Sequence, residues 1–250
     1  MKDLEDKYCP WKKSKIAIMQ PYFFPYIGYI SLMKYADYFV FFDTPQYIRK
    51  GWINRNRILD AKGTSSYITV PVQKTARDTA IADIYIDNER AWQERILGQL
   101  SVYKRRAPFY RQTVEVVRSV IESECNLISE LAIKSCIEVS RYLGMELQYD
   151  IFSKMNLLID KVDAPDEWAL RIADALQYDI YVNPPGGMEF FDNGKYQKAG
   201  IQLQFLKSSL STYKQRIGTF IPGLSIIDVM MFNSIEDSQK MLDDYVILEE

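Results

Sequence analysis

Residues 43–57 read DTPQYIRKGWINRNR and concentrate side chains that are suited to binding an anion. Arginine and lysine are positively charged, and a guanidinium group binds phosphate or carboxylate oxygens through two parallel hydrogen bonds. Asparagine and glutamine add neutral hydrogen bonds, and the tryptophan offers a face for stacking. The stretch predicts a site for an acceptor-rich anionic ligand, such as a nucleotide-sugar diphosphate, bound by Gln46, Lys50, Trp52, Asn54, Arg55 and Arg57. The alternative is a solvated basic turn with an ion-pair network.

Asp43 is the first residue of this stretch and directly follows the apolar run YFVFF, residues 38–42. A carboxylate at the carboxyl end of a buried strand is well placed for a ligand, because open parallel sheets bind ligands at that edge. We therefore expect Asp43 to be catalytic, as a base or as an orienting group. The alternative is a cap on a helix or turn.

The segment QPYFFPYIGY, residues 20–29, supplies a second set of candidates. Rings with hydroxyl tips in a loop that leaves a strand suit the face of a sugar. The predicted substrate-binding residues are Gln20, Tyr22 and Tyr26, and the predicted catalytic residue is Tyr29. Phe23 and Phe24 are expected to pack inward, and Gly28 to let a ligand approach the start of a helix. The alternative is an aromatic core between strand and helix.

Two later segments complete the set of candidates. NPPGG, residues 183–187, follows a predicted strand and offers free backbone N–H groups, although an ordinary turn has the same composition. STYKQR, residues 211–216, adds polar side chains. The predicted binding residues here are Asn183, Gly186, Gly187, Tyr213 and Gln215. Asp228, in LSIIDVMMFN, is either a site carboxylate or a member of a buried network.

Composition excludes several classes of chemistry. The 250-residue chain contains no histidine, so a Ser-His-Asp triad, a His-ligated zinc and a His base are unavailable, and we expect no metal site. Proton transfer falls to Asp, Glu, Tyr, Lys, Cys or the substrate. The formal net charge of −2 argues against nucleic acid as a partner.

Cysteine usage and hydropathy predict a cytoplasmic protein that does not insert into membranes. The three cysteines include no CxxC pair, which is typical of a reducing compartment. The first fifteen residues are charged and lack the apolar core of a signal peptide, and no run of 18 apolar residues occurs.

Hydrophobic periodicity predicts alternating strands and helices. Predicted strands are 16–19, 38–42, 65–72, 81–87, 145–150, 178–182 and 201–207. Predicted helices are 30–35, 91–104, 108–123, 127–143, 165–177 and most of the last forty residues. This order favours one α/β domain with a mostly parallel, Rossmann-like sheet and a helical insertion near 90–143, whose amphipathic helices are candidates for core packing or a homodimer face. The loops 20–29, 43–57 and 183–190 then share one rim.

MQPYFFPYIGY, KGWINRNRIL, NPPGG and PGLSIIDVMMFN resemble the WbqC-like family, and the resemblance runs from Lys15 to about Asn233. Members occur among bacterial genes for O-antigen and other surface polysaccharides. The resemblance implies a transferase that places an acyl or aminoacyl group, glycyl being one option, on a nucleotide-linked or lipid-linked amino sugar. The alternative is a non-catalytic component of the same pathway that binds a nucleotide sugar or serves assembly.

YIGY, residues 26–29, also resembles the H-x-G-H tetrad of the nucleotidylyltransferase fold, which binds nucleotide phosphates at the start of a helix. That resemblance implies ATP as a possible activator beside an acyl thioester donor, and the cofactor stays unknown. Tyrosine donates hydrogen bonds but lacks the charge of imidazolium, so phosphate or sugar binding survives the change better than adenylyl transfer. WbqC-like proteins often carry histidines where this chain has WQERILGQL and SLSTYKQRIG. Either histidine is not essential, or this branch has altered or lost a step.

Overall fold

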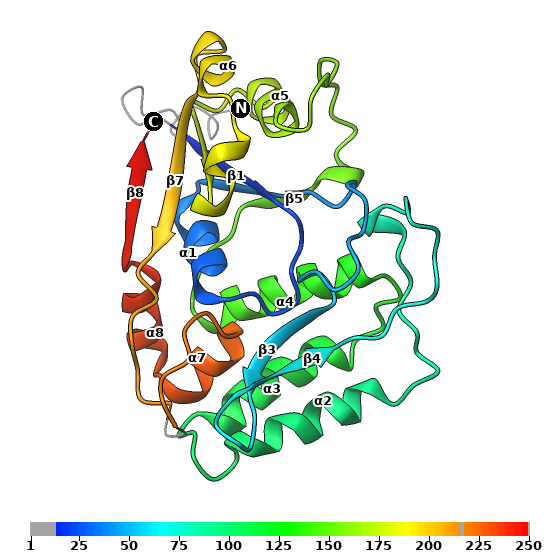
Figure 1. Cartoon of the computed structure of the whole chain (residues 1–250), viewed down its shortest axis with the longest axis vertical. Coiled ribbons are helices and arrows are strands. Elements are labelled where there is room, and N and C mark those ends of the chain that lie inside the picture. Colours follow the sequence, from blue (N-terminus) through cyan, green and yellow to red (C-terminus); the bar gives the residue numbers. More distant parts are fainter. Residues whose placement is uncertain (1–13, 216–217, 250) are drawn as a thin grey trace, which may run out of the picture.

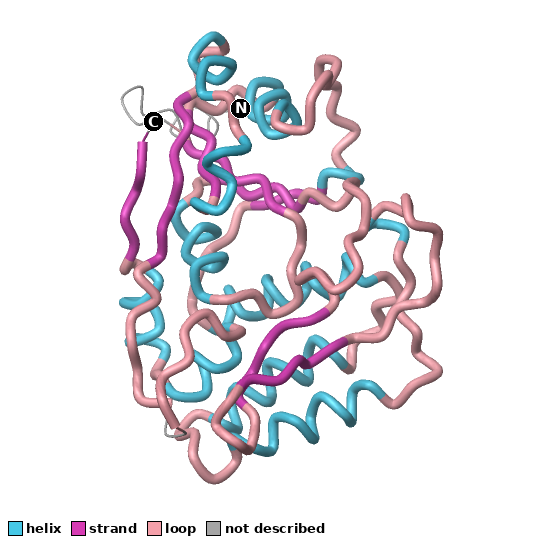
Figure 2. Tube along the Cα trace, in the orientation of Figure 1, coloured by secondary structure: helices cyan, strands magenta, loops and turns pink. Residues whose placement is uncertain are grey.

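The central sheet is six-stranded and mostly parallel, in a computed structural model that describes residues 14–215 and 218–249. Five parallel strands are followed by β8, which is antiparallel to β7 (Figures 1 and 2). Across the sheet the order is β5 (Tyr149–Ile151), β2 (Tyr38–Phe41), β1 (Lys15–Met19), β6 (Ile180–Asn183), β7 (Gln202–Ser208) and β8 (Tyr245–Glu249). The predicted Rossmann-like α/β class is confirmed.

Helices cover both faces of this sheet, which is why its central strands are apolar throughout rather than alternating. In β1, Ala17 packs into one core cluster, whereas Ile16 and Ile18 pack into another. The first cluster includes α1 (Ile27–Tyr35), α2 (Trp92–Leu100), α3 (Tyr110–Ile121), α4 (Ile128–Tyr142), α7 (Ile226–Phe232) and α8 (Ile235–Leu242). The second includes α5 (Glu167–Ala175) and α6 (Asn193–Lys198).

A separate antiparallel hairpin, β3 (Arg55–Leu59) and β4 (Ser65–Thr69), lies below the main sheet in Figure 1. Its buried residues, including Ile58 and Ile68, join the same core cluster as the helices α1 to α4. The hairpin therefore reaches the main sheet through that shared core. Its first strand was not predicted, because polar residues outnumber apolar ones in RNRIL.

Two other predicted elements were wrong. Residues 81–87 form a 3-10 turn, Ile81–Asp83, and isolated bridges, because their backbone groups bond to separate loops: Ile81 N donates to Pro45 O, and Ile86 N to Asn126 O. At the C-terminal end, the predicted helix gives way to β8 after α8. β8 pairs with β7 over residues 204–208, a tertiary contact that local periodicity does not reveal.

The loop between β1 and α1 is held by side chains from distant parts of the chain. Phe24 has a φ of 40°, which is unusual for a bulky residue. Its N–H donates to Ser135 Oγ at 2.9 Å, and its carbonyl accepts from Asn56 Nδ2 at 2.9 Å and Ser225 Oγ at 2.7 Å. Asn56 Nδ2 also donates to Phe23 O at 3.2 Å. Thus α4, β3 and the start of α7 jointly fix this loop.

Asn56→Ala should lower the free energy of unfolding by about 1–3 kcal/mol, because it removes the amide donor to two buried carbonyls. Urea unfolding followed by circular dichroism measures the loss. Lys62→Ala, at an exposed side chain of the same hairpin, is the control. A loss below about 0.5 kcal/mol for Asn56→Ala would contradict this role.

Candidate functional site

The order of the strands places a crevice at the carboxyl ends of β1 and β6. From β1 the chain passes to β2 on one side and later returns to β6 on the other side, so the direction of winding reverses between these two strands. Open α/β sheets bind ligands at such a switch point. In this chain the two strands end at Met19 and Asn183.

A pocket of about 260 Å³ opens at this crevice. We call it the tyrosine pocket. It is formed by the ends of β1 and β6, the loop before α1, the hairpin strand β3 and the turn before α7. Its lining residues are Met19, Tyr22, Tyr26, Tyr29, Trp52, Asn56, Arg57, Pro184 and Gly223. Two of the three predicted rim loops, together with the start of the third, therefore meet at one pocket.

The three tyrosines of this pocket differ in what their hydroxyl groups do. Tyr29 is fully buried, and its hydroxyl donates to Gln20 O at 2.9 Å. Tyr22 and Tyr26 are half-buried, and no described residue forms a hydrogen bond with either hydroxyl. Burial raises the pKa of both tyrosines above the ordinary value, so their hydroxyls stay protonated at neutral pH and can donate to a ligand.

Arg57 brings a positive charge into the tyrosine pocket. Its guanidinium carbon lies 5.9 Å from the centre of the Trp52 ring, and Nη2 donates to Gly223 O at 3.3 Å. Its Nε is buried without a hydrogen-bond partner, and no carboxylate in residues 14–215 or 218–249 pairs with it. Because Arg57 lines the pocket and its charge is not paired with a described carboxylate, it is suited to an anion that enters the pocket.

Arg55 lies on the same strand but serves the protein itself. Its guanidinium carbon stacks 4.2 Å from the centre of the Tyr67 ring, and Nε donates to Gly51 O at 3.2 Å. Nη2 donates to Lys50 O, in a turn where Lys50 has a φ of 63°. The two arginines, equivalent in the sequence pattern, therefore have different surroundings.

A second pocket, of about 230 Å³, adjoins the first. We call it the aromatic pocket. Its lining residues are Ile18, Met19, Gln20, Tyr22, Phe42, Pro165, Trp168, Ala169, Tyr181, Asn183, Phe190 and Phe191. Met19 and Tyr22 line both pockets, which therefore share a wall at the end of β1.

A model of the WbqC-like protein family matches residues 20–240. The chain belongs to this family. It is also 26% identical over 222 residues to "Uncharacterized protein Rv1507c" of Mycobacterium tuberculosis. The aligned region covers 88% of this chain and 93% of that protein. No solved structure matches. The matched range includes every residue of the tyrosine pocket except Met19.

Within this WbqC-like chain, Asp43 is buried and engaged with a neighbouring strand end. Its carboxylate accepts from Ser153 N at 3.0 Å and from Ser153 Oγ at 2.6 Å. Asp43 thus ties the end of β2 to the turn after β5, which corresponds to the capping alternative. It does not line either pocket at the switch point.

Gly28 and Gly187 make room for side chains of the protein itself, whereas Gly186 does not. A Cβ on Gly28 would lie 2.5 Å from Tyr26 Cε2, so this glycine makes room for the tyrosine ring rather than for a ligand. A Cβ on Gly187 would lie 2.6 Å from Asn183 Nδ2. Gly186 is exposed and has open space around it. Neither Gly186 nor Gly187 lines the two pockets.

Tyr213 and Gln215 belong to a buried network around Asp228. The carboxylate of Asp228 accepts from Tyr103 Oη at 2.6 Å, Tyr213 Oη at 2.5 Å and Gln215 Nε2 at 2.9 Å. Burial raises the pKa of Asp228, while these donors oppose the rise. Gln215 also exchanges two hydrogen bonds with the backbone of Ile221. The network option for Asp228 is the one that the structure shows.

The remaining polar candidates are dispersed. Asn54 is buried and donates to Val70 O at 2.8 Å, within the hairpin region. Gln46 is exposed, donates to Arg77 O and lines a different hollow, whereas Lys50 is exposed and lines neither switch-point pocket. Asn183 lines the aromatic pocket, where Tyr181 Oη donates to its Oδ1 at 3.1 Å.

Several lining residues were not selected as binding residues from the sequence, although Asn56 was counted among the hydrogen-bond donors of residues 43–57. Asn56 stands between two arginines that drew attention for their charge, and Gly223 and Trp168 lie more than a hundred residues from the tyrosine loop. If residues 55–59 had been predicted as a strand, Asn56 and Arg57 would have been assigned to its opposite faces. No local signal indicates Gly223 or Trp168.

The described residues contain no cluster of three or more Cys, Asp and Glu side chains arranged to hold a metal ion. In the same part of the chain, no helix has the length and apolar character needed to cross a membrane.

Tyr29→Phe should lower the free energy of unfolding by about 1 kcal/mol, because Gln20 O loses its buried donor. Tyr26→Phe should leave stability within about 0.5 kcal/mol of the wild type, because no described residue bonds to its hydroxyl. Urea unfolding of the two variants side by side measures the difference. Equal losses of unfolding free energy in the two variants would contradict the difference between a bonded Tyr29 hydroxyl and an unbonded Tyr26 hydroxyl.

Proposed function

We propose that this WbqC-like protein is a transferase in surface-polysaccharide biosynthesis that binds a phosphorylated amino sugar in the tyrosine pocket. The acceptor is a nucleotide-linked or lipid-linked amino sugar, and the transferred group is an acyl or aminoacyl group. The observation that carries the proposal is Arg57, which lines the pocket without a carboxylate partner among the described residues, beside the hydroxyls of Tyr22 and Tyr26, to which no described residue bonds. A phosphate oxygen would satisfy the guanidinium, and sugar hydroxyls would satisfy Tyr22 and Tyr26.

The pocket's contribution to such a transfer is binding and orientation. The described residues that line it include no carboxylate, thiol or imidazole, and its tyrosines remain protonated at neutral pH. An amine attacks a thioester carbonyl without prior removal of a proton: the C–N bond forms, the C–S bond breaks, and the proton lost by nitrogen passes to the departing thiolate. With an acyl adenylate made from ATP, AMP leaves instead. Positioning alone accelerates such a step substantially.

The same lack of a titrating group favours a second candidate, a non-catalytic component that binds a nucleotide sugar. Product analysis separates the two candidates. UDP- and dTDP-linked amino sugars are incubated with acetyl-CoA, or with glycine and ATP, and the products are examined by mass spectrometry. An N-acylated or N-glycylated sugar nucleotide, with release of CoA thiol or AMP, supports the transferase. Saturable binding without any amide product across the panel supports the binding component.

Arg57→Ala should weaken the binding of a nucleotide sugar by about 10- to 100-fold, because a charge-assisted hydrogen bond contributes about 1.5–3 kcal/mol. Arg55→Ala is the matched control from the same strand, and we expect it to keep the affinity while losing about 1 kcal/mol of stability through its ring and carbonyl contacts. Thermal shift and isothermal titration calorimetry measure both quantities.

The wild-type protein should gain about 2.7 kcal/mol of stability at a ligand concentration of 100 times the dissociation constant. Equal weakening by both arginine variants would indicate a general effect of charge rather than a specific contact by Arg57. A full panel of nucleotide sugars without any stabilisation would restrict the proposal to lipid-linked acceptors.

A further inference from the structure

The aromatic pocket is lined by a residue, Gln20, whose side-chain amide no described residue uses. Gln20 lines the pocket, its side-chain amide forms no hydrogen bond with any described residue, and its backbone carbonyl accepts from Tyr29. A primary amide offers one acceptor and two donors on a single edge. In this position that edge is available to a ligand.

The rest of the pocket is built from ring faces. Phe42 packs against Trp168 with ring centres 5.5 Å apart, and Phe190 at the rim has 54% of its surface exposed. Planar heterocycles stack on such rings with little dependence on their exact identity. An aliphatic chain would fill the same space but would leave the Gln20 amide without a partner.

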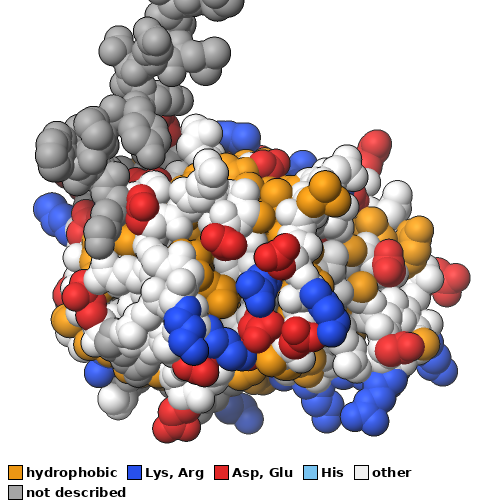
Figure 3. All heavy atoms as spheres, turned by 90° about the horizontal axis from the view of Figure 1, so that it is seen from above, with side chains coloured by type: hydrophobic (Ala, Val, Ile, Leu, Met, Phe, Trp, Pro, Cys, Tyr) orange, Lys and Arg blue, Asp and Glu red, His pale blue; other side chains and the backbone are white. Residues whose placement is uncertain are grey.

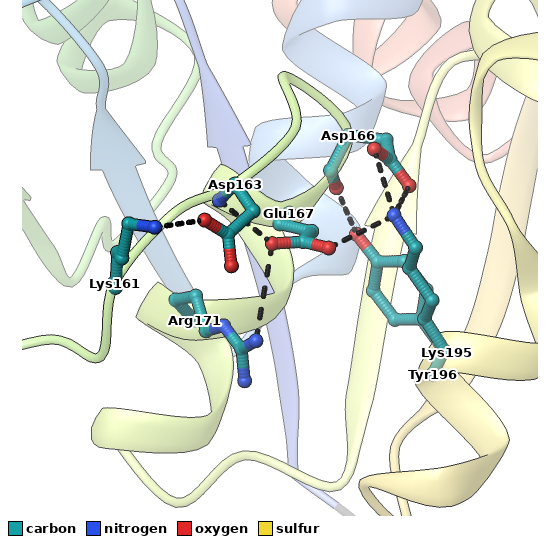
Figure 4. A network of polar contacts seen from close by, with 7 residues as sticks. All are labelled: Lys161, Asp163, Asp166, Glu167, Arg171, Lys195 and Tyr196. Carbon is teal, nitrogen blue, oxygen red and sulfur yellow. Dashed lines mark hydrogen bonds and ion pairs between the residues drawn. The ribbon is translucent and has the colours of Figure 1, made fainter.

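Four charged side chains near this pocket form ion pairs with one another. Figure 4 shows Lys195 of α6 facing both acidic residues that open α5: its Nζ lies 3.0 Å from Asp166 Oδ2 and 2.9 Å from Glu167 Oε1. Glu167 also lies 3.8 Å from Arg171 Nη2. Seen from that end in Figure 3, acidic and basic side chains are intermingled. No charged side chain of the described residues lines the pocket itself.

The two pockets therefore have complementary chemistry across the wall formed by Met19 and Tyr22. The tyrosine pocket offers a guanidinium and hydroxyl groups, whereas the aromatic pocket offers ring faces and one amide edge. We propose that the aromatic pocket binds a nucleobase, stacked on its rings and hydrogen-bonded by Gln20, while the phosphate of the same nucleotide extends past Tyr22 toward Arg57. This inference rests on the proposed function in taking both pockets as parts of one substrate site.

Two molecules could supply that base, and the preferred base distinguishes them. A nucleotide-sugar acceptor carries uracil, thymine, guanine or cytosine, whereas an acyl-CoA or acyl-adenylate donor carries adenine. Dissociation constants are measured by calorimetry for AMP, GMP, CMP, UMP and dTMP, and for ribose 5-phosphate, which lacks a base. At least one nucleotide should bind about 5- to 150-fold more tightly than ribose 5-phosphate.

Gln20→Ala should bring the affinity for that nucleotide toward the affinity for ribose 5-phosphate, and should leave ribose 5-phosphate binding unchanged. The substitution keeps the backbone carbonyl that bonds to Tyr29, so the fold should be unaffected. Trp168→Ala is a second variant that removes a stacking wall. Arg57→Ala is the opposite control, because it should weaken the nucleotide and ribose 5-phosphate by the same factor.

The nucleobase proposal is overturned if no nucleotide binds at millimolar concentration, if none binds more tightly than ribose 5-phosphate, or if Gln20→Ala weakens both classes equally. These outcomes are separate from failure of the proposed function. A base preference that Gln20→Ala abolishes, without any amide product, would overturn the transferase and retain the nucleobase site. Amide formation that depends on Arg57 but not on Gln20 would retain the transferase and overturn the nucleobase site.

Discussion

The fold depends on how the loop between β1 and α1 satisfies its buried backbone groups. Residues 21 and 23–25 are buried, where an unpaired N–H or C=O is costly, and the left-handed φ of Phe24 precludes regular ladder pairing. The partners come from Trp52 O, Ser135 Oγ, Asn56 Nδ2 and Ser225 Oγ. These four groups lie near β3, in α4 and at the start of α7, so one loop aligns the hairpin and two helices with the edge of the sheet.

At the switch point, some polar side chains are hydrogen-bonded within the protein and others remain available to a ligand. Tyr29 and Arg55 are engaged by backbone carbonyls, whereas Tyr22, Tyr26 and Arg57 present polar atoms that no described residue uses. The carbonyl of Trp52 accepts the N–H of Phe23, and the ring of Trp52 lies beside Arg57 at the pocket. Residues that stabilise the loop, such as Trp52 and Asn56, therefore also line the pocket.

Many elements were predictable because their signals are local. The apolar runs of β1, β2 and β6, and the periodicity of α3 and α4, indicated their structure and position closely. β3 was missed because its polar residues serve neighbouring segments, and β8 because its pairing with β7 is a tertiary contact. Likewise, the sequence identified residues 43–57 as rich in side chains that could bind a ligand, but it could not show which of them are free to do so. Asn54, Arg55 and Asp43 are already bonded within the protein. Their partners are Val70 for Asn54, Lys50 and Gly51 for Arg55, and Ser153 for Asp43.

The sequence by itself determined the family, the mostly parallel α/β class, the lack of histidine chemistry, and the inward packing of Phe23 and Phe24. Those properties follow from composition, periodicity and motif, which are encoded over short distances. Only the tertiary structure decided that Asp43 binds Ser153, that Arg57 rather than Arg55 enters a pocket, and that Gly223 and Trp168 help to line the crevice. The physical reason is that a polar side chain is available to a ligand only when the rest of the chain leaves it unpaired, and long-range contacts determine that.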